Sequence, residues 1–150
     1  EIVFSPETLA NTSTELKEII KKICRGYRTM TRTVSWQEVT EFVNKISQIH
    51  KEKHFTGVYG IPRGGLVPAV MISYALKIPL LMAPSHGCII VDDIADTGRS
   101  LCHYLVNETQ MTDYFIATIY YHNRSIVRPN YYMKDKGSDW VMFPWEVNEA

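Results

Sequence analysis

The feature that most constrains the fold of this chain is a strand, an acidic turn and a helix in direct succession over residues 88–101. Residues 89–91 are an uninterrupted β-branched run, which is typical of a strand buried on both faces of a sheet. Asp92 and Asp93 follow that run at once, and a helix is expected over about residues 98–107. The segment therefore predicts one β-turn-α unit with carboxylates at the carboxyl end of its strand.

Strands and helices alternate along the rest of the chain. Capping boxes, in which a Ser or Thr pairs with a Glu three residues later, predict helix starts at Thr12 and Ser35. Behind Ser35, apolar residues recur at helical spacing, and we interpret Trp36 as part of that core-facing stripe. The expected elements are helices at 12–26, 35–50, 66–77 and 98–107, and strands at 57–60, 78–82, 88–91, 114–121, 131–133 and 140–143. This alternation predicts an α/β fold, a mostly parallel sheet with helices on both faces.

Composition narrows the class of protein further. The 150 residues, 45% of them apolar, fit a helical extension at 1–33 and one compact domain at 34–150. The formal net charge is zero and the basic residues are scattered, which argues against a nucleic-acid-binding face. No apolar run approaches the roughly 18 residues of a membrane span, and the first residues do not resemble a secretory signal. Cys24, Cys88 and Cys102 have apolar flanks and no metal-ligand spacing, so we expect free buried thiols in a cytoplasmic protein.

Residues 60–65 form a first candidate phosphate-binding turn. In an open parallel sheet, ligands bind where strands end and helices begin. Gly64 and its glycine neighbours let backbone N–H groups converge on an anion, and Arg63 offers a planar fork for phosphate oxygens. A tight strand-to-helix turn with a surface arginine explains the same residues equally well.

The acidic turn after the third expected strand is more specific. Two adjacent carboxylates at a strand end repel each other and need hydroxyl donors, a cation or both. A sugar diol and a hydrated Mg²⁺ would satisfy Asp92 and Asp93. Thr97, Gly98 and Ser100 then supply two hydroxyls and an unobstructed N–H at a helix N-terminus, which suits a phosphate. A diol site followed by a phosphate site is the order that ribose 5-phosphate presents.

Other interpretations of this turn fit less well. An Asp-Asp-x-x-Asp cluster binds diphosphates through metals in prenyl-transferring enzymes, but there it lies on helices and lacks the strand and the Thr-Gly pair. A phosphatase-type nucleophile would need Asp-x-Asp at the strand end, which this turn lacks. Asp96 could also serve only as the cap of the helix that begins at Thr97.

These motifs resemble those of the type I phosphoribosyltransferases. Residues 91–98, Val-Asp-Asp-Ile-Ala-Asp-Thr-Gly, match the signature with which that family binds phosphoribosyl pyrophosphate. Residues 60–66 match the pyrophosphate loop of its 6-oxopurine branch. Residues 140–146 are similar to the end of the xanthine/guanine and archaeal hypoxanthine enzymes. The resemblance covers about residues 34–146.

The resemblance implies a role for each matching position. Asp92 and Asp93 would hold the ribose hydroxyls and, through water, Mg²⁺. Arg63 and Gly64 would face the pyrophosphate, with Arg63 stabilising its departure, and Asp96 would meet the purine imidazole nitrogen as a general base or hydrogen-bond partner. The residues implied around the ribose phosphate are Ala95, Asp96, Thr97, Gly98, Arg99 and Ser100, and those implied at the purine are His122, Trp140 and Val141.

Two departures from the family pattern matter. In the longer xanthine/guanine enzymes, a lysine after the Thr-Ile-Tyr-Tyr strand contacts the purine 6-oxygen, whereas residues 118–121 of this chain are followed by His122. The long mobile loop that closes over the substrates is replaced by about residues 83–87. Closure excludes water, so we expect slow turnover or another lid, either the helix at 12–26 or a partner subunit.

The sequence therefore predicts a Mg²⁺-dependent purine phosphoribosyltransferase of the salvage type. Its ligands would be phosphoribosyl pyrophosphate, a purine base and a nucleoside monophosphate, and it would have no nucleic-acid or membrane partner. The alternative is a non-catalytic sensor of phosphoribosyl pyrophosphate or nucleotide with the same fold. The resemblance also implies a homodimer, for which the aromatic-rich stretch at 114–133 is a candidate interface.

Overall fold

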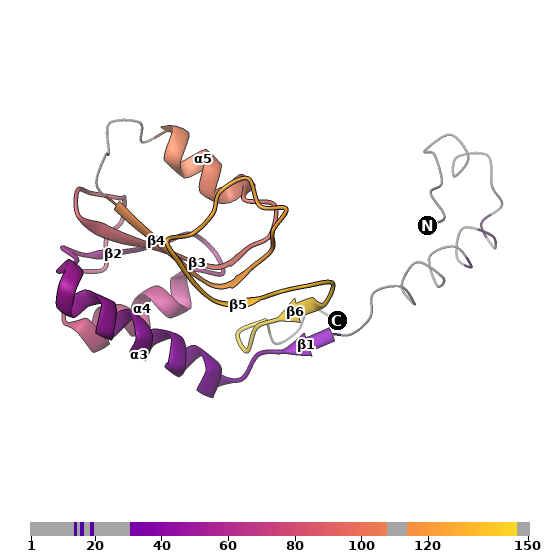
Figure 1. Ribbon diagram of the computed structural model, residues 1–150, viewed down its shortest axis with the longest axis horizontal. Coiled ribbons are helices and arrows are strands. Elements are labelled where there is room, and N and C mark those ends of the chain that lie inside the picture. Colours follow the sequence, from indigo (N-terminus) through magenta and orange to yellow (C-terminus); the bar gives the residue numbers. More distant parts are fainter. Residues whose placement is uncertain (1–13, 15, 17–18, 20–30, 108–113, 147–150) are drawn as a thin grey trace.

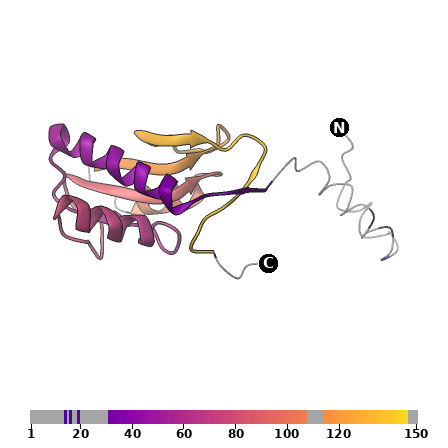
Figure 2. The same ribbon diagram turned by 90° about the horizontal axis from the view of Figure 1, so that it is seen from below.

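The computed structural model describes residues 14, 16, 19, 31–107 and 114–146. Its elements are β1 (Thr31–Thr33), α3 (Trp36–Lys53), β2 (Val58–Gly60), α4 (Leu66–Leu76), β3 (Cys88–Ala95), α5 (Arg99–Asn107), β4 (Tyr114–Tyr121), β5 (Tyr131–Asp135) and β6 (Trp140–Met142). Four strands form one sheet in the order β2-β3-β4-β5, and every neighbouring pair is parallel. Helices α3 and α4 lie together on one face of this sheet and α5 lies on the other (Figure 1 and Figure 2). The predicted α/β fold is confirmed.

Strand β3 lies inside the sheet because its side chains are apolar on both faces. Ile89 and Val91 pack in the core on the side of α3 and α4. Cys88 and Ile90 point the opposite way and share a cluster with Leu101 of α5. Side chains alternate along a strand, so a continuous apolar run needs cover on both sides. The three helices supply that cover.

Helix α3 begins at the predicted capping box. The Ser35 hydroxyl accepts a hydrogen bond from the Glu38 N–H at 3.1 Å, and the Glu38 carboxylate accepts one from the Ser35 N–H at 2.9 Å. The same carboxylate pairs with Lys134 of β5. Partial burial would by itself raise the pKa of Glu38, but the hydrogen bonds from Lys134 and Ser35 outweigh it and lower that pKa. One side chain thus caps the helix and joins it to the sheet.

We expect Ser35→Ala to lower the free energy of unfolding by about 1 kcal/mol, because N–H groups at the start of α3 lose their partners. Urea denaturation measures this change. Ser47→Ala in the same helix is the matched control, since the Ser47 hydroxyl only bonds back to the Val43 carbonyl and alanine favours a helix. An equal loss in the two variants would show that the cap contributes nothing specific.

The connection from β4 to β5, residues 122–130, joins two parallel strands without a helix. It packs against the acidic turn, where the Ile126 N–H donates to the Thr97 carbonyl at 3.0 Å. Gly98 has a φ of 78°, and a Cβ there would come within 2.9 Å of the Ile126 nitrogen. Only glycine fits both the conformation and the space. Residues 122–130 therefore pack against the turn after β3 and hold it in place.

The predicted strand at 78–82 is wrong. Val58 of β2 forms an isolated bridge with Leu80, in which the Val58 N–H donates to the Pro79 carbonyl and the Leu81 N–H donates to the Val58 carbonyl. Pro79 has no N–H to extend a ladder, and Leu80 is 42% exposed. The apolar run is an irregular edge of the sheet.

The prediction that Trp36 belongs to the core-facing stripe of its helix is also wrong. The Trp36 side chain is 52% exposed and not part of the core. It stands in the first turn of α3, where its ring lies 6.0 Å from that of Trp145. The buried members of the stripe are Val39, Phe42, Val43 and Ile46. Trp36 is the first residue of α3, and the residues that pack in the core lie further along the helix.

Strands β1 and β6 form a separate two-stranded parallel sheet beside the main one (Figure 1). Arg32 and Asp139 add an ion pair of 3.3 Å between β1 and the loop before β6. Strand β1, which pairs with β6, precedes the predicted domain boundary after residue 33, and that boundary stays a prediction. Residues 14, 16 and 19 of the helix predicted at 12–26 are helical, and the remainder of that helix lies outside the described residues.

Two predictions drawn from composition can be compared with the structure. Neither Cys88 nor Cys102 is in a disulfide, and Cys88 is buried whereas Cys102 on α5 is partly exposed. Cys24 lies outside the described residues. In the part of the chain that the structure describes, no helix combines the length and apolar character needed to cross a membrane.

Candidate functional site

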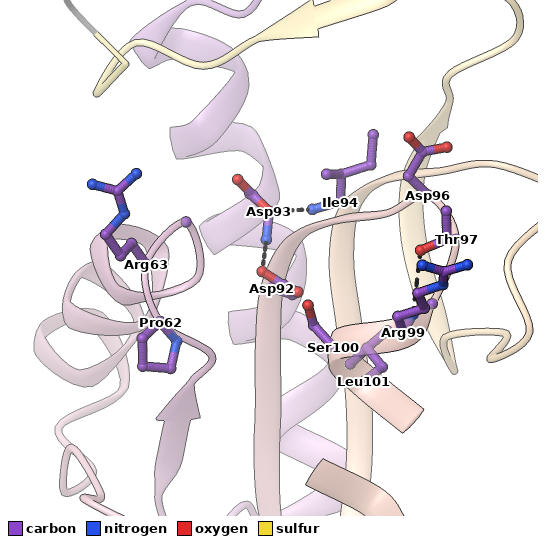
Figure 3. A pocket seen from close by; sticks show the side chains of 12 residues that line it. Pro62, Arg63, Asp92, Asp93, Ile94, Asp96, Thr97, Arg99, Ser100 and Leu101 are labelled. Atoms are coloured by element: carbon purple, nitrogen blue, oxygen red, sulfur yellow. Dashed lines mark hydrogen bonds between the residues drawn. The ribbon is translucent and has the colours of Figure 1, made fainter. Parts of the chain in front are cut away.

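The turns after β2 and β3 line one cavity of about 290 Å³ at the carboxyl edge of the sheet. Figure 3 shows the loop that carries Arg63 on one side of Asp92 and Asp93, and the turn that carries Thr97 and Ser100 on the other. The lining residues are Pro62, Arg63, Gly64, Asp92, Asp93, Ile94, Asp96, Thr97, Gly98, Arg99, Ser100 and Leu101. The structure thus brings the two turns singled out in the sequence together around one hollow.

The unequal lengths of the strands next to β3 open the edge at which the two aspartates lie. Strand β3 pairs with β2 only as far as Val91, but it pairs with β4 as far as Ala95. Its predicted end at residue 91 is therefore too early. From Asp92 onward the β2 side of the strand is unpaired, and Asp92 and Asp93 stand at that open edge.

The two carboxylates lie beside each other, Asp92 buried and Asp93 half-buried. Asp92 is 7% exposed and accepts a hydrogen bond from the Asp93 N–H at 2.9 Å, while Asp93 accepts one from the Ile94 N–H at 2.7 Å. Burial first, and the charge of Asp93 second, raise the pKa of Asp92 well above its usual range. Burial also raises the pKa of Asp93, against hydrogen bonds from Asp92 and Ile94. Among the described residues no ion pair compensates them, so the site favours a ligand that brings positive charge or hydroxyl donors.

The loop after β2 approaches these carboxylates closely. A Cβ on Gly64 would lie 1.9 Å from Asp93 Oδ2, and one on Gly65 would lie 2.3 Å from the Val91 carbonyl oxygen. The Ile61 N–H donates to the Val91 carbonyl, and the Gly65 N–H donates to the Ile61 carbonyl, each at 2.9 Å. At Gly65 backbone atoms leave no room for a Cβ, and at Gly64 a Cβ would displace the Asp93 carboxylate.

The turn from Thr97 to Ser100 opens helix α5 toward the cavity. The Thr97 hydroxyl accepts a hydrogen bond from the Arg99 N–H at 3.4 Å, and the first helical bond runs from the Cys102 N–H to the Gly98 carbonyl at 2.8 Å. N–H groups in the first turn of a helix have no carbonyl partner within it. Together with the hydroxyls of Thr97 and Ser100, this helix end is suited to an anion.

A second cavity of about 220 Å³ adjoins the first. Its lining residues are Asp96, His122, Arg124, Lys136, Gly137, Ser138, Asp139 and Trp140. Of the residues that line these two cavities, only Asp96 belongs to both. Trp140 of β6 is 51% exposed and gives the second cavity an aromatic wall. The cavity between the two turns and the cavity with the aromatic wall thus meet at one carboxylate.

Asp96 is held by two cations. Arg124 Nε and Nη2 each lie 2.8 Å from Asp96 Oδ1, and Lys136 Nζ lies 3.3 Å from Oδ2. Partial burial would by itself raise the pKa of Asp96, but the hydrogen bond from Arg124 and the charge of Lys136 outweigh it, and the pKa lies below its ordinary value. At neutral pH Asp96 is therefore an ionised hydrogen-bond acceptor. Its carboxylate meets these side chains rather than helix N–H groups, so it is more than a helix cap.

His122 lines the second cavity directly after β4. Its backbone N–H donates to the Ala95 carbonyl at 2.9 Å, and its Nδ1 accepts a hydrogen bond from the Arg124 N–H at 3.1 Å. Because the Nδ1 lone pair is used, the neutral ring carries its proton on Nε2. His122 therefore has one ring donor left for a ligand.

Two predicted site residues line neither cavity. Ala95 is 1% exposed and packs with Leu101 beneath α5. Val141 is 8% exposed and packs in the core on the other face. Both side chains point inward, and their chain neighbours Asp96 and Trp140 line the cavities instead.

Sequence reasoning missed Lys136 and Arg124. Asp135, the last residue of β5, pairs with Tyr121, the last residue of the neighbouring strand β4. The residues that follow them, Lys136 and His122, therefore lie at the same edge of the sheet. Basic residues in short polar loops form no recognisable pattern. One signal could have found them, because the residues that follow neighbouring parallel strands meet at the same edge of a sheet.

The aspartate pair fits a magnesium ion that is shared with a substrate. Within the described residues no group of three or more His, Cys, Asp or Glu side chains forms a metal cage. Mg²⁺ is commonly held by one or two carboxylates, waters and substrate phosphates. Burial raises the pKa of Asp92 and of Asp93, so a bound cation would favour their ionised forms. These donors are the ones Mg²⁺ prefers.

Known proteins are similar to this chain in sequence and in architecture. No family model matches the chain. A xanthine-guanine phosphoribosyltransferase of Cereibacter sphaeroides is 31% identical, over 60% of this chain and 68% of that protein. One of Chromohalobacter salexigens is 27% identical, over 79% of this chain and 85% of that protein. The solved purine phosphoribosyltransferase of Pyrococcus horikoshii superposes with a TM-score of 0.68 at 27% identity, over 77% of this chain and 93% of that one.

Proposed function

The chain belongs to the type I phosphoribosyltransferases, which are enzymes, and we propose that it is a magnesium-dependent 6-oxopurine phosphoribosyltransferase of purine salvage. The observation that supports this most is the position of Asp96, where the two cavities meet. A bond between ribose and base would form at such a junction. The relatives named for xanthine and guanine support a 6-oxopurine as the acceptor.

The first cavity is proposed to hold phosphoribosyl pyrophosphate in one orientation. Asp92 and Asp93 accept hydrogen bonds from the ribose hydroxyls, while Arg63 and Gly64 face the pyrophosphate. The 5-phosphate is bound at the start of α5 by Thr97, Gly98, Arg99 and Ser100. Asp92 and Asp93 would also hold Mg²⁺, which when bound would neutralise charge on the departing pyrophosphate.

The second cavity is proposed to hold the purine against Trp140. The lone pair of a purine imidazole nitrogen forms a bond to the anomeric carbon as the bond from that carbon to the pyrophosphate oxygen breaks, with inversion. Pyrophosphate leaves with the bonding electron pair, and the proton on the other imidazole nitrogen is released to water. The enzyme supplies positioning and charge, and no covalent nucleophile is needed. Asp96 accepts a hydrogen bond from the imidazole N–H of the base. The lowered pKa of Asp96 favours this role over that of a strong general base. His122 Nε2 donates a hydrogen bond to the edge of the purine ring.

The test is incubation of the protein with phosphoribosyl pyrophosphate, Mg²⁺ and each of guanine, xanthine, hypoxanthine and adenine, followed by mass spectrometry. We expect nucleoside monophosphate and pyrophosphate with at least one 6-oxopurine, and no product when Mg²⁺ is removed by a chelator. Failure of phosphoribosyl pyrophosphate and of all nucleotides to bind would contradict the assignment of the site.

One observation favours a second candidate, a nucleotide sensor. The connection from α4 to β3 is limited to residues 77–87, and a bridge from Leu80 to Val58 ties it to β2, so it does not supply a long closing loop that would exclude water during turnover. Tight binding of nucleotide without product from any base would support the sensor. The homodimer, the cytoplasmic location and a lid formed by the segment before residue 31 stay predictions.

A further inference from the structure

We propose that Lys136 selects purines that carry an oxygen at C6, through a donor and acceptor pair that it forms with Asp96. The inference rests on the proposed function and names the residue that would recognise the 6-oxygen in the second cavity. It assigns the 6-oxygen contact to a residue after β5, where the family resemblance points to the position after β4.

Lys136 is the inner of the two cations on Asp96. Its side chain is 12% exposed and its Nζ lies 3.3 Å from Asp96 Oδ2, whereas the Arg124 side chain is 55% exposed and holds Oδ1. The backbone fixes its position, since the Lys136 N–H donates to the Tyr121 carbonyl at 2.8 Å. The Gly137 N–H then bonds to Asp135 Oδ1 at 2.8 Å, which turns the chain away. The ammonium is therefore held in the wall of the second cavity.

The Asp96 and Lys136 pair complements one edge of a 6-oxopurine. On that edge an imidazole N–H, a donor, stands next to the oxygen on C6, an acceptor. The carboxylate of Asp96 accepts and the ammonium of Lys136 donates, in the same order and side by side. Adenine has an amino group at C6, which would place a donor against the ammonium. Buried donors left unpaired in this way are what makes such sites discriminate.

His122 is a poorer candidate for this contact. Its Nδ1 is already used by the Arg124 N–H, so only the Nε2 proton remains for a ligand. Lys136 has three N–H donors and can donate to a carbonyl oxygen while it keeps Asp96 as a partner. A charged donor in a partly buried cavity also binds an oxygen more strongly than a neutral one.

Hypoxanthine and adenine differ in the group at C6, and they are the probes. For Lys136→Met we expect kcat/KM with hypoxanthine to fall by about 10- to 100-fold, while kcat/KM with adenine does not fall and the KM for phosphoribosyl pyrophosphate is unchanged. Arg124→Met is the matched control, because it removes the other cation from Asp96. It should lower the values for both bases by the same factor. Equal losses with both bases in Lys136→Met would overturn the proposal, because Lys136 would then only hold Asp96.

A binding measurement separates this inference from the proposed function. If the unmodified protein makes no product, calorimetry compares inosine and adenosine 5′-monophosphate. A preference for the inosine nucleotide that Lys136→Met abolishes supports the role of Lys136 even without catalysis. An unchanged preference, or none in the unmodified protein, overturns it. Binding of neither nucleotide rejects the site and the inference together. Lys136→Gln, which keeps a neutral donor, replaces Lys136→Met if thermal denaturation shows that the methionine variant does not fold.

Discussion

Gly64→Ala should weaken the binding of phosphoribosyl pyrophosphate by about 100-fold and leave the fold intact. The new Cβ would lie 1.9 Å from Asp93 Oδ2 and 2.4 Å from Asp93 Cγ, so the carboxylate must turn aside. A group misplaced by about 1 Å typically costs a site about 100-fold. Calorimetry with phosphoribosyl pyrophosphate and Mg²⁺ measures the loss, and thermal denaturation checks the fold.

Gly65→Ala is the matched control, one residue along the same loop. There the new Cβ would lie 2.3 Å from the Val91 carbonyl oxygen and 2.8 Å from the Ile61 nitrogen, both of which are backbone atoms. Backbone cannot rotate away, so we expect a loss of about 3 kcal/mol in the free energy of unfolding. If Gly64→Ala destabilised the protein as much as Gly65→Ala, or bound ligand normally, the account of Asp93 would be wrong.

Asp92→Asn is expected to have opposite effects on stability and on binding. In the absence of ligand the Asp92 carboxylate is buried beside Asp93 without a cation, and burial and that neighbour raise its pKa. A neutral amide removes this repulsion, so unfolding should require on the order of 1 kcal/mol more. The same change removes a ligand for the ribose hydroxyls and Mg²⁺, and Mg²⁺-dependent binding of phosphoribosyl pyrophosphate should fall by about 100-fold or more.

Glu41→Gln is the control for that result, because it removes the same charge from an exposed position on α3. Its stability should change by less than about 0.5 kcal/mol and its ligand binding should stay the same. Urea denaturation and calorimetry of both variants give the comparison. A loss of stability in Asp92→Asn would mean that the carboxylate is needed to hold the turn, and that the pair is structural.

The elements that could be predicted are those whose causes are local. The β-branched run before Asp92 predicts a buried strand, and the exchange of hydrogen bonds between Ser35 and Glu38 predicts the start of α3. The apolar run at 78–82 misleads because hydrophobic residues alone cannot distinguish a paired strand from an exposed edge. Here a proline and the lack of a partner decide the outcome.

The residues of the candidate site also differ in whether a local pattern reveals them. The turn after β3 could be recognised because its carboxylates, hydroxyls and glycine are consecutive in the sequence. Lys136 has no such local motif, because its contact with Asp96 spans 40 positions and depends on the register in which β4 pairs with β5. Ala95 and Val141 lie within the matching motifs, but strand alternation turns their side chains inward.

The two cavities share one residue, and this has a consequence for how such a protein can change. The walls of the cavity proposed for the sugar phosphate come from the turns after β2 and β3, whereas the walls of the cavity proposed for the base come from the segments that follow β4 and β5 and from the start of β6. Mutations in the second set can alter the preferred base without disturbing the first. Natural selection, or a library of variants at residues 136–140, can therefore change the preferred acceptor base without altering the residues proposed to bind phosphoribosyl pyrophosphate. Asp96 must be kept in either case, because it lines both cavities.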